Sequence, residues 1–254
     1  MNTQSNGYTV VYSAIMVVVV AAALTLVSQG LKSRQVANEE NFNRASILKS
    51  AGITPGEDIS ADFKKYVTDG FVVDSLNGDK SGTLDEAFKL ASNLASKKGK
   101  FSDTKKYPVF VLNKDGEQKY IVPINGAGLW DRIWGFVSLK SDFNTIDGVV
   151  FDHAGETPGL GAEMTKPKWT QHFVGKTMEL NNEGQVTVVK IYKGNASSDP
   201  AHGVDAISGS TMTSNGVEKM VNNSLQYYMG FKKKLGKTSA APSVATVNNN
   251  NAND

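Results

Sequence analysis

The stretch YPVFVLNKDGEQKYIVPI, residues 107–124, places two runs of aromatic and β-branched residues on either side of the polar turn NKDGEQ. Runs of this composition, bounded by turn residues, are typical of β-strands. Two further runs follow along the chain, IWGFVSL at 133–139 and TIDGVVF at 145–151. We therefore expect an antiparallel sheet over residues 107–152 at the centre of the fold.

A helix is expected shortly before this sheet, in SGTLDEAFKLASNLASKKGK at residues 81–100. Thr83 and Glu86 have the spacing of a capping box, and lysines with a glycine close the segment. The overlapping stretch NGDKSGTLDEAF, residues 77–88, has polar side chains at alternating positions, like a calcium-binding loop. Its twelfth position is Phe88, where such a loop needs a bidentate Glu, so we reject a calcium site.

After the sheet, QVTVVKIY at 185–192 predicts one more strand, and a long helix is expected to begin near Thr213. The whole pattern indicates an α+β fold, with a single N-terminal transmembrane helix followed by an antiparallel-sheet domain and flanking helices. We divide the chain into an N-terminal tail (1–7), a transmembrane helix (8–28), a helical stalk (29–52), a soluble domain in two parts (53–120 and 121–237) and a disordered tail (238–254).

The transmembrane helix is predicted from YTVVYSAIMVVVVAAALTLVS, residues 8–28, which contains no charged residue. At about 1.5 Å per residue it reaches roughly 31 Å, enough to cross a hydrocarbon core. A cleaved signal peptide is the alternative, but the preceding residues lack Lys or Arg and the apolar run exceeds the usual ~7–15 residues. Lys32 and Arg34 follow the helix, and the positive-inside rule alone favours a cytoplasmic domain.

Composition excludes several classes of function. The chain has 254 residues and a formal net charge of +2, which gives no electrostatic footprint for nucleic acid. The absence of cysteine removes disulfides, thiolate nucleophiles and cysteine-ligated iron–sulfur clusters. The histidines, His153, His172 and His202, show no metal-ligand spacing, so we interpret them as structural and expect neither a metal site nor a catalytic residue.

The stretch DAISGSTMTSNG, residues 205–216, gathers small hydroxyl residues and glycine directly ahead of the last helix. Free backbone N–H groups at a helix start, with Gly allowing close approach, form a site for an anion such as phosphate. Plain N-capping by Ser or Thr explains one or two of these hydroxyls. The residues alone leave both interpretations open.

A second glycine-rich stretch, HAGETPGLGAEM at 153–164, packs a proline and glycines around Leu160. In isolation it predicts a tight turn with Gly at positive φ. Another glycine pair occurs in GAGLWD at 126–131, but Asp131 stands where a dinucleotide fingerprint needs its third glycine. We therefore expect no NADH site in this chain.

The hydroxyl-rich stretch carries a resemblance to a known family. DAISGSTMTS, residues 205–214, resembles the flavinylation motif of the FMN-binding domain family, in which a Thr holds FMN through a phosphoester bond. The resemblance implies attachment at Thr211, with Ser210 standing where the family usually has Ala. INGAGLWDRIWGFVSL (124–139) and HAGETPGLGAEM are similar to segments of the C subunit family of Na⁺-translocating NADH:quinone reductases. The G subunit family of Rnf complexes shares part of this pattern and is the alternative.

This resemblance implies covalent FMN as the cofactor, held by residues 121–237. An isoalloxazine ring is flat and needs an apolar face with hydrogen bonds at its edge, which a Pro-Gly-Leu-Gly turn offers. We expect Leu160 to pack on the ring and Glu156 to hold the turn, while Trp169 is either a core residue or a flavin neighbour. The expected cofactor-binding residues are Gly128, Leu129, Trp130, Glu156, Thr157, Gly159, Leu160, Gly161, Trp169, Asp205, Ser208, Gly209, Ser210, Thr211 and Thr213.

The family resemblance also implies a function. The chain is expected to relay electrons from NADH toward quinone between other membrane and peripheral subunits of the complex, after a separate flavin transferase has attached FMN. The resemblance places the soluble domain on the periplasmic side of the bacterial inner membrane, against the indication from Lys32 and Arg34, because large domains translocate largely regardless of such charges. A non-redox, membrane-anchored binding module, whose hydroxyl loop is only a helix cap, is the competing class.

Overall fold

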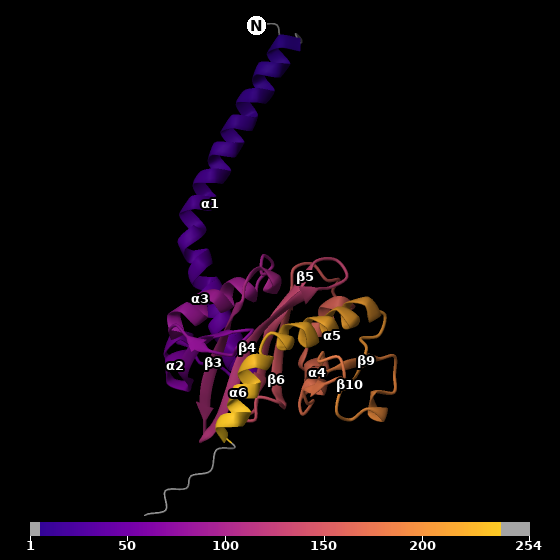
Figure 1. The fold of residues 1–254 in the computed structure, drawn as a ribbon. Helices are drawn as coiled ribbons and strands as arrows, with labels where there is room; N and C mark the ends of the chain where they lie inside the picture. Colours follow the sequence, from indigo (N-terminus) through magenta and orange to yellow (C-terminus); the bar gives the residue numbers. More distant parts are fainter. Residues whose placement is uncertain (1–5, 240–254) are drawn as a thin grey trace, which may run out of the picture. The chain divides into compact units, whose positions relative to one another are not determined.

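The computed structural model describes residues 6–239, so the predicted tail at 238–254 lies almost entirely outside the described residues. The chain divides into two compact units, with the boundary after Asn43. In chain order (Figure 1), the helices and strands are α1 (Asn6–Ser50), α2 (Ile59–Tyr66), β1 (Val67–Asp74), β2 (Lys80–Ser81), α3 (Leu84–Leu94), β3 (Lys106–Lys114), β4 (Glu117–Ala127), β5 (Arg132–Leu139), β6 (Ile146–His153), α4 (Pro167–Thr170), β7 (Glu179–Leu180), β8 (Val186–Thr187), β9 (Lys190–Tyr192), β10 (Gly203–Asp205), α5 (Thr211–Gln226) and α6 (Met229–Ser239).

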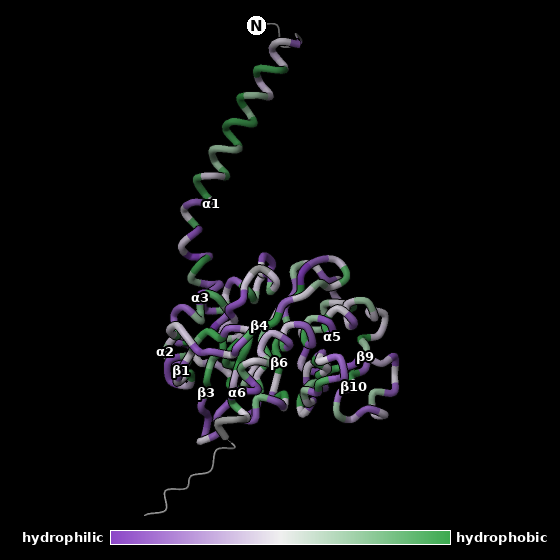
Figure 2. Tube along the Cα trace, viewed as in Figure 1, coloured by the Kyte–Doolittle hydropathy of each residue, from purple (hydrophilic) through white to green (hydrophobic). Residues whose placement is uncertain are grey.

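α1 is one continuous helix, so no break separates the expected anchor (8–28) from the expected stalk (29–52). Residues 8–52 contain no proline, and Gly30 is accommodated within the helix. Among the described residues, α1 is the one helix that is long and apolar enough to cross a membrane, by length and composition. Figure 2 shows its N-terminal part as largely hydrophobic and the part that follows as more hydrophilic.

The central sheet has six antiparallel strands in the order β2-β1-β3-β4-β5-β6. The strands predicted between residues 107 and 152 are confirmed as β3 to β6. Lys114 pairs with Glu117, so only two residues connect β3 and β4. These are Asp115 and Gly116, with φ of 54° and 85°. Positive φ at both positions is what a two-residue type I′ hairpin turn requires, and Asp-Gly is favoured there.

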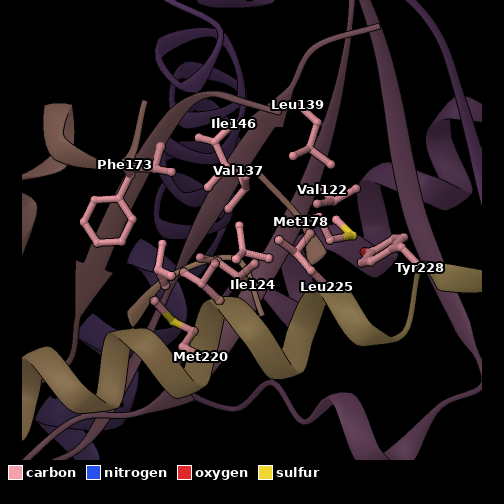
Figure 3. Packing of buried hydrophobic residues seen from close by; sticks show 14 of the residues in the cluster. Val122, Ile124, Val137, Leu139, Ile146, Phe173, Met178, Met220, Leu225 and Tyr228 are labelled. Atoms are coloured by element: carbon pink, nitrogen blue, oxygen red, sulfur yellow. The ribbon is translucent and has the colours of Figure 1, made fainter. Parts of the chain in front are cut away.

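Both faces of the sheet are buried. Successive residues along a strand point to opposite sides, so each strand contributes side chains to two cores. On β3, Val109 and Val111 belong to the core shared with α5 and α6, whereas Phe110 and Leu112 belong to the core shared with α2, α3 and the end of α1. Figure 3 shows the first of these cores. Its labelled residues are Val122, Ile124, Val137, Leu139, Ile146, Phe173, Met178, Met220, Leu225 and Tyr228.

The predicted helix before the sheet is confirmed as α3, and its capping box is formed by Thr83 and Glu86 in both directions. The helix ends at Leu94, before the lysines that were expected to close it. The Asn125 side-chain amide donates to the carbonyls of Leu94 and Ser96 at 2.8 and 2.7 Å. These bonds satisfy carbonyls at the end of the helix, and the lysine-rich segment continues as a loop. The patterns of the sequence did not predict the neighbouring α2 and β1.

The single strand predicted at 185–192 is wrong, because the segment forms two short strands, β8 and β9. Between them, the Asn222 side-chain oxygen accepts the N–H groups of Val188 and Val189 at 2.9 and 3.1 Å. The Asn222 amide donates back to the Val189 carbonyl at 2.9 Å. A side chain from α5 therefore replaces the strand neighbour that a continuous strand needs.

The last predicted helix starts at Thr211, slightly earlier than expected, and is interrupted between α5 and α6. Tyr228 is fully buried at this interruption, and its hydroxyl donates to the Pro108 carbonyl at 3.1 Å. The expected division of the soluble domain at residues 120 and 121 falls within β4, and the chain from Arg44 onward forms one compact unit.

Candidate functional site

Three segments meet beside the start of α5. They are the hairpin loop between β4 and β5 (128–131), the glycine turn after β6 (156–161) and the hydroxyl loop before α5 (206–210). The glycine turn and the hydroxyl loop approach closely, because a Cβ placed on Gly209 would lie 3.0 Å from Cδ2 of Leu160. Glycine at position 209 thus leaves the space that the leucine side chain uses.

Glu156, in the glycine turn, connects the hairpin loop to the first turn of α5. Its side chain is 3% exposed, and its carboxylate accepts hydrogen bonds from the Trp130 N–H at 3.0 Å and from the Thr213 hydroxyl at 2.7 Å. The Glu156 N–H donates to Nδ1 of His153 at 3.2 Å. A buried carboxylate with two donors fixes the hairpin loop and the first turn of α5 against the glycine turn.

The glycine turn presents backbone rather than side chains. The Leu160 N–H donates to the Thr157 carbonyl at 3.1 Å, with Pro158 and Gly159 between them. Gly159 has a φ of 74°, which confirms the expected glycine at positive φ. Pro at the second position and a positive-φ Gly at the third are the preferences of a type II turn. The hydroxyl loop repeats the conformation, with Gly209 at a φ of 73°.

The first turn of α5 has backbone donors to offer. In the described part of the chain, no acceptor receives the N–H groups of Thr211, Met212 or Thr213, and the N-cap residue Ser210 makes no side-chain capping bond. These N–H groups form the positive end of the helix dipole. The arrangement suits an anion placed at the helix start.

Burial distinguishes the hydroxyl residues from Ser210 to Ser214. Thr213 and Ser214 are fully buried, and Ser210 is 5% exposed. The Thr213 hydroxyl is already bonded to Glu156, and the Ser214 hydroxyl donates to the Ser210 carbonyl at 2.9 Å. Thr211 is the member of this run whose side chain remains partly exposed.

Large apolar side chains stand exposed around these segments. The exposed fractions are 48% for Leu129, 70% for Trp130, 43% for Leu160 and 64% for Met212. Exposed apolar groups grouped beside polar ones mark binding surfaces. The sequence patterns pointed to the first three residues and missed Met212. Its position next to Thr211, in the first turn of α5, is the signal that could have found it.

An ion pair fixes the hairpin loop. The Lys97 ammonium lies 2.6 Å from the Asp131 carboxylate, and the Asp131 carbonyl accepts the Gly128 N–H at 2.8 Å. The Lys97 hydrogen bond, followed by the bond from the Arg132 N–H, holds the pKa of Asp131 below its ordinary value. The loop that carries Trp130 is therefore held by a carboxylate that stays ionised at neutral pH.

Asp205 and Trp169 have partners of their own. The Trp169 indole N–H donates to the Asp205 carbonyl at 2.8 Å, and the indole is 8% exposed among core phenylalanines. The Asp205 carboxylate accepts the N–H groups of Asn195 and Ala196, both at 3.0 Å. Together they brace the chain that leads into the hydroxyl loop.

Comparison with known proteins identifies the family. Residues 128–226 match the FMN-binding domain family. The C subunit of the Na⁺-translocating NADH-quinone reductase of Haemophilus ducreyi is 34% identical over 235 residues, which cover 87% of each chain. The same subunit of Vibrio anguillarum is 33% identical over 201 residues, covering 74% of this chain and 78% of the relative. This chain belongs to the C subunit family of that reductase.

Solved structures of the C subunit family share the fold. The crystal structure of the Parabacteroides distasonis subunit is 39% identical, has a TM-score of 0.70 and is covered over 96% of its length by 80% of this chain. The Shewanella oneidensis subunit has a TM-score of 0.66 at 28% identity, over 79% of this chain and 99% of that one. The fold of this chain is therefore that of the C subunit family, and its FMN-binding domain contains the hairpin loop, the glycine turn, the hydroxyl loop and α5.

The residues at the start of α5 fit an FMN group. Backbone donors and an accessible hydroxyl suit its phosphate, and the exposed apolar side chains suit its flat ring. Among the described residues there is no group of three or more His, Asp or Glu side chains placed to hold a metal ion. The site of this C subunit therefore has the chemistry to hold an anionic, partly apolar cofactor.

Proposed function

We propose that the chain carries FMN on Thr211, through a phosphoester bond to its side-chain oxygen, and relays electrons between partner subunits of a Na⁺-translocating NADH:quinone reductase. One observation carries this proposal: Thr211 is partly exposed, while the hydroxyls of Ser210, Thr213 and Ser214 are buried. The backbone N–H groups of Thr211 to Thr213 are placed to donate hydrogen bonds to the remaining phosphate oxygens. Interaction with the helix dipole contributes about 0.3–1 kcal/mol.

For the flavin ring, we assign the surface between the glycine turn and the hairpin loop. Leu160 supplies the apolar contact, and Gly209 leaves room for it. Leu129 and Trp130 extend this surface, with Met212 on the side of α5. We assign polar contacts for the ring edge and the phosphate to the backbone of Thr157, Gly159, Gly161 and Gly128, together with Ser208. Glu156 fixes the glycine turn relative to Trp130 and Thr213 through its two hydrogen bonds.

FMN supplies the capacity to accept and release electrons one or two at a time. The chain itself offers no dinucleotide fingerprint, since Asp131 replaces the third glycine of GAGLWD. Electrons must then arrive from and leave to other subunits, in agreement with the name of the relatives, which describes one subunit of a larger reductase. The role of this chain is to hold FMN at a fixed place and to prevent its dissociation.

Attachment requires a separate enzyme. Formation of the Thr211 ester from FAD makes one oxygen–phosphorus bond, breaks the pyrophosphate bond, releases AMP and removes the hydroxyl proton. The described residues of this chain contain no metal cluster for phosphoryl transfer. We therefore assign this step to a flavin transferase, and the chain contributes the hydroxyl and the N–H groups that position it.

We place the chain in the bacterial inner membrane as a single-pass protein, with its soluble domain on the periplasmic side. The apolar part of α1 supports the anchor, and membership of the C subunit family supports the orientation. Lys32 and Arg34 do not oppose it, because large domains translocate largely regardless of nearby charges. A C-terminal cysteine tag tests it in intact cells. Labelling by a membrane-impermeant maleimide supports the orientation, and labelling only after lysis contradicts it.

The attachment is tested by producing the full chain together with a flavin transferase and measuring its intact mass and its ultraviolet fluorescence in a denaturing gel. Thr211→Ala is expected to lose the adduct, while Thr211→Ser retains it because the hydroxyl is kept. Ser210→Ala is the matched control for a neighbouring hydroxyl and is expected to keep the full adduct, while Thr213→Val is expected to keep the adduct at reduced yield, because it removes the bond to Glu156. A colourless wild-type chain, or an adduct that survives Thr211→Ala, contradicts the proposal.

A further inference from the structure

A second polar site lies away from the hydroxyl loop. A recess of about 400 Å³ opens between the segment after α3, strands β4 and β5, and the C-terminal half of α5. Its polar lining includes Lys100, Ser102, Asn125, Arg132, Asn223 and Tyr227. Asn223 lies roughly 18 Å along α5 from Thr211, at about 1.5 Å per residue. The α5 side of the recess therefore lies well away from the proposed attachment point at Thr211.

The Arg132 guanidinium is held in place at the wall of this polar recess. Its Nη2 donates to the Gly99 carbonyl and to the Asn125 side-chain oxygen. Asn125 is 7% exposed, and its own amide is fixed by the carbonyls of Leu94 and Ser96. A guanidinium has five N–H donors, and among the described residues the side-chain bonds of Arg132 come from Nη2, so those on Nε and Nη1 find no acceptor. A buried asparagine thus orients an arginine whose Nε and Nη1 hydrogens are left for a ligand.

The segment that closes the polar recess is strongly basic. Residues 97–106, KKGKFSDTKK, contain five lysines and one aspartate. Lys97 is paired with Asp131 of the hairpin loop, whereas Lys100 lines the recess and pairs with no carboxylate among the described side chains. Lys100 and Arg132 therefore place two positive charges on one small polar site.

We propose that the polar recess binds a phosphate group. Arg132 offers the N–H donors of Nε and Nη1, one of which bonds a phosphate oxygen, and Lys100 offers its ammonium to another oxygen. The Asn223 amide and the Tyr227 hydroxyl add neutral donors on the side of α5. A carboxylate has two oxygens and leaves part of this donor set unused, whereas a phosphate group uses it and matches its charge. The volume lies within the range of about 300–1,000 Å³ that is usual for ligand sites.

A phosphate group of this kind has two sources, a lipid headgroup or a dissolved phosphate compound. The first test uses the full chain with FMN attached, in neutral detergent, so that the start of α5 does not compete for the added ion. Hydrogen exchange of residues 95–103 is measured with inorganic phosphate and with chloride at equal ionic strength. Phosphate at ten times its Kd is expected to slow exchange about tenfold, because protection of a closed state scales with 1 + [L]/Kd.

Two variants separate the polar recess from the rest of the surface. Asn223→Asp adds a carboxylate and Lys100→Gln removes a charge, both at exposed positions that line it. Each is expected to raise the Kd for phosphate at least tenfold, which lowers the protection from about tenfold to about twofold or less at the same phosphate concentration. Asn182→Asp and Lys193→Gln make the same charge changes at exposed positions outside the lining and are expected to keep it. Equal protection in Asn223→Asp and the wild type overturns the proposal, even if Arg132 variants fail to fold.

The second test distinguishes the sources. The chain is placed in phosphate-free nanodiscs of phosphatidylcholine, with or without phosphatidylglycerol, and exchange of residues 95–103 is compared. Protection that depends on phosphatidylglycerol and is lost in Asn223→Asp assigns the site to a lipid headgroup. Protection by dissolved phosphate alone assigns it to a soluble phosphate compound. Absence of protection in both tests overturns the proposal.

Discussion

The Thr213 hydroxyl donates to the buried Glu156 carboxylate at 2.7 Å, and this bond joins the glycine turn to the first turn of α5. Thr211, the proposed attachment point, lies in that same helical turn. The other oxygen of Glu156 accepts the Trp130 N–H at 3.0 Å. One carboxylate therefore sets the position of the proposed phosphate site relative to both loops assigned to the flavin ring.

Replacing Glu156 by Ala is expected to lower the free energy of unfolding by about 1–3 kcal/mol, because the Thr213 hydroxyl loses its acceptor inside the protein. The same change is expected to reduce flavin incorporation, since the glycine turn and α5 lose their link. Glu156→Gln keeps the volume and can bond to both partners once the Thr213 hydroxyl reverses its role. Chemical denaturation and in-gel fluorescence measure the two effects.

The comparison of the two Glu156 variants tests the positioning role directly. Glu156→Gln is expected to stay within about 1 kcal/mol of the wild type and to keep its flavin. If Glu156→Ala matches the wild type in both measurements, the carboxylate does not position the site. Thr213→Val serves as the matched partner, and its effect is expected not to add to that of Glu156→Ala, because both remove the same bond.

Two glycines of the glycine turn separate conformational strain from steric conflict. Gly159 has a φ of 74° with open space around it, so Gly159→Ala is expected to cost about 1–2 kcal/mol from backbone strain alone. A Cβ on Gly161 meets the Glu156 carboxylate and lies 2.8 Å from the Thr213 hydroxyl oxygen. Gly161→Ala is therefore expected to disrupt the Glu156 to Thr213 bond and to reduce flavin incorporation more than Gly159→Ala does.

Thermal unfolding and intact mass of the two alanine variants, produced side by side with the transferase, check this order. A Gly161→Ala chain that incorporates FMN as fully as the wild type shows that the close contact is relieved elsewhere. If Gly159→Ala loses flavin incorporation while Gly161→Ala keeps it, the expected order of the two glycines is wrong.

The parts of this fold that are encoded locally could be predicted from the sequence. The β3 to β4 hairpin follows from alternating strand residues around Asp115 and Gly116, and α3 follows from its capping box. The Glu156 to Thr213 bond joins residues 57 positions apart, and the capture of residues 188 and 189 by Asn222 is similarly remote. Such side-chain bonds depend on packing, so no local pattern predicts them.

Trp169 provides a test of an open prediction. Its indole N–H donates to the Asp205 carbonyl at 2.8 Å, and its ring is buried among phenylalanines. Trp169→Phe keeps an aromatic ring but leaves that carbonyl without its donor, so a loss of about 1–2 kcal/mol in unfolding free energy is expected. The visible absorption band of the bound flavin is expected to be unchanged, whereas a shifted band identifies Trp169 as a flavin neighbour.

The ion pair of Lys119 and Asp147 joins strands β4 and β6 of the sheet. The two groups are 2.7 Å apart, with side chains 11% and 17% exposed, and the Lys119 ammonium also donates to the Ala51 carbonyl at 3.4 Å. Removing one partner leaves a poorly solvated charge, so Asp147→Asn is expected to lower the unfolding free energy by about 1–3 kcal/mol. A double-mutant cycle with Lys119→Met measures the coupling of the pair.

The pair of Lys97 and Asp131 is the matched control, because its side chains are 63% and 34% exposed at a similar distance of 2.6 Å. Its coupling is expected to be smaller and to fall further when salt is added, since water and ions screen exposed charges. The Lys119 to Asp147 coupling is expected to change little between low salt and high salt. Equal coupling energies and equal salt dependence in the two cycles contradict the view that burial strengthens the ion pair between β4 and β6.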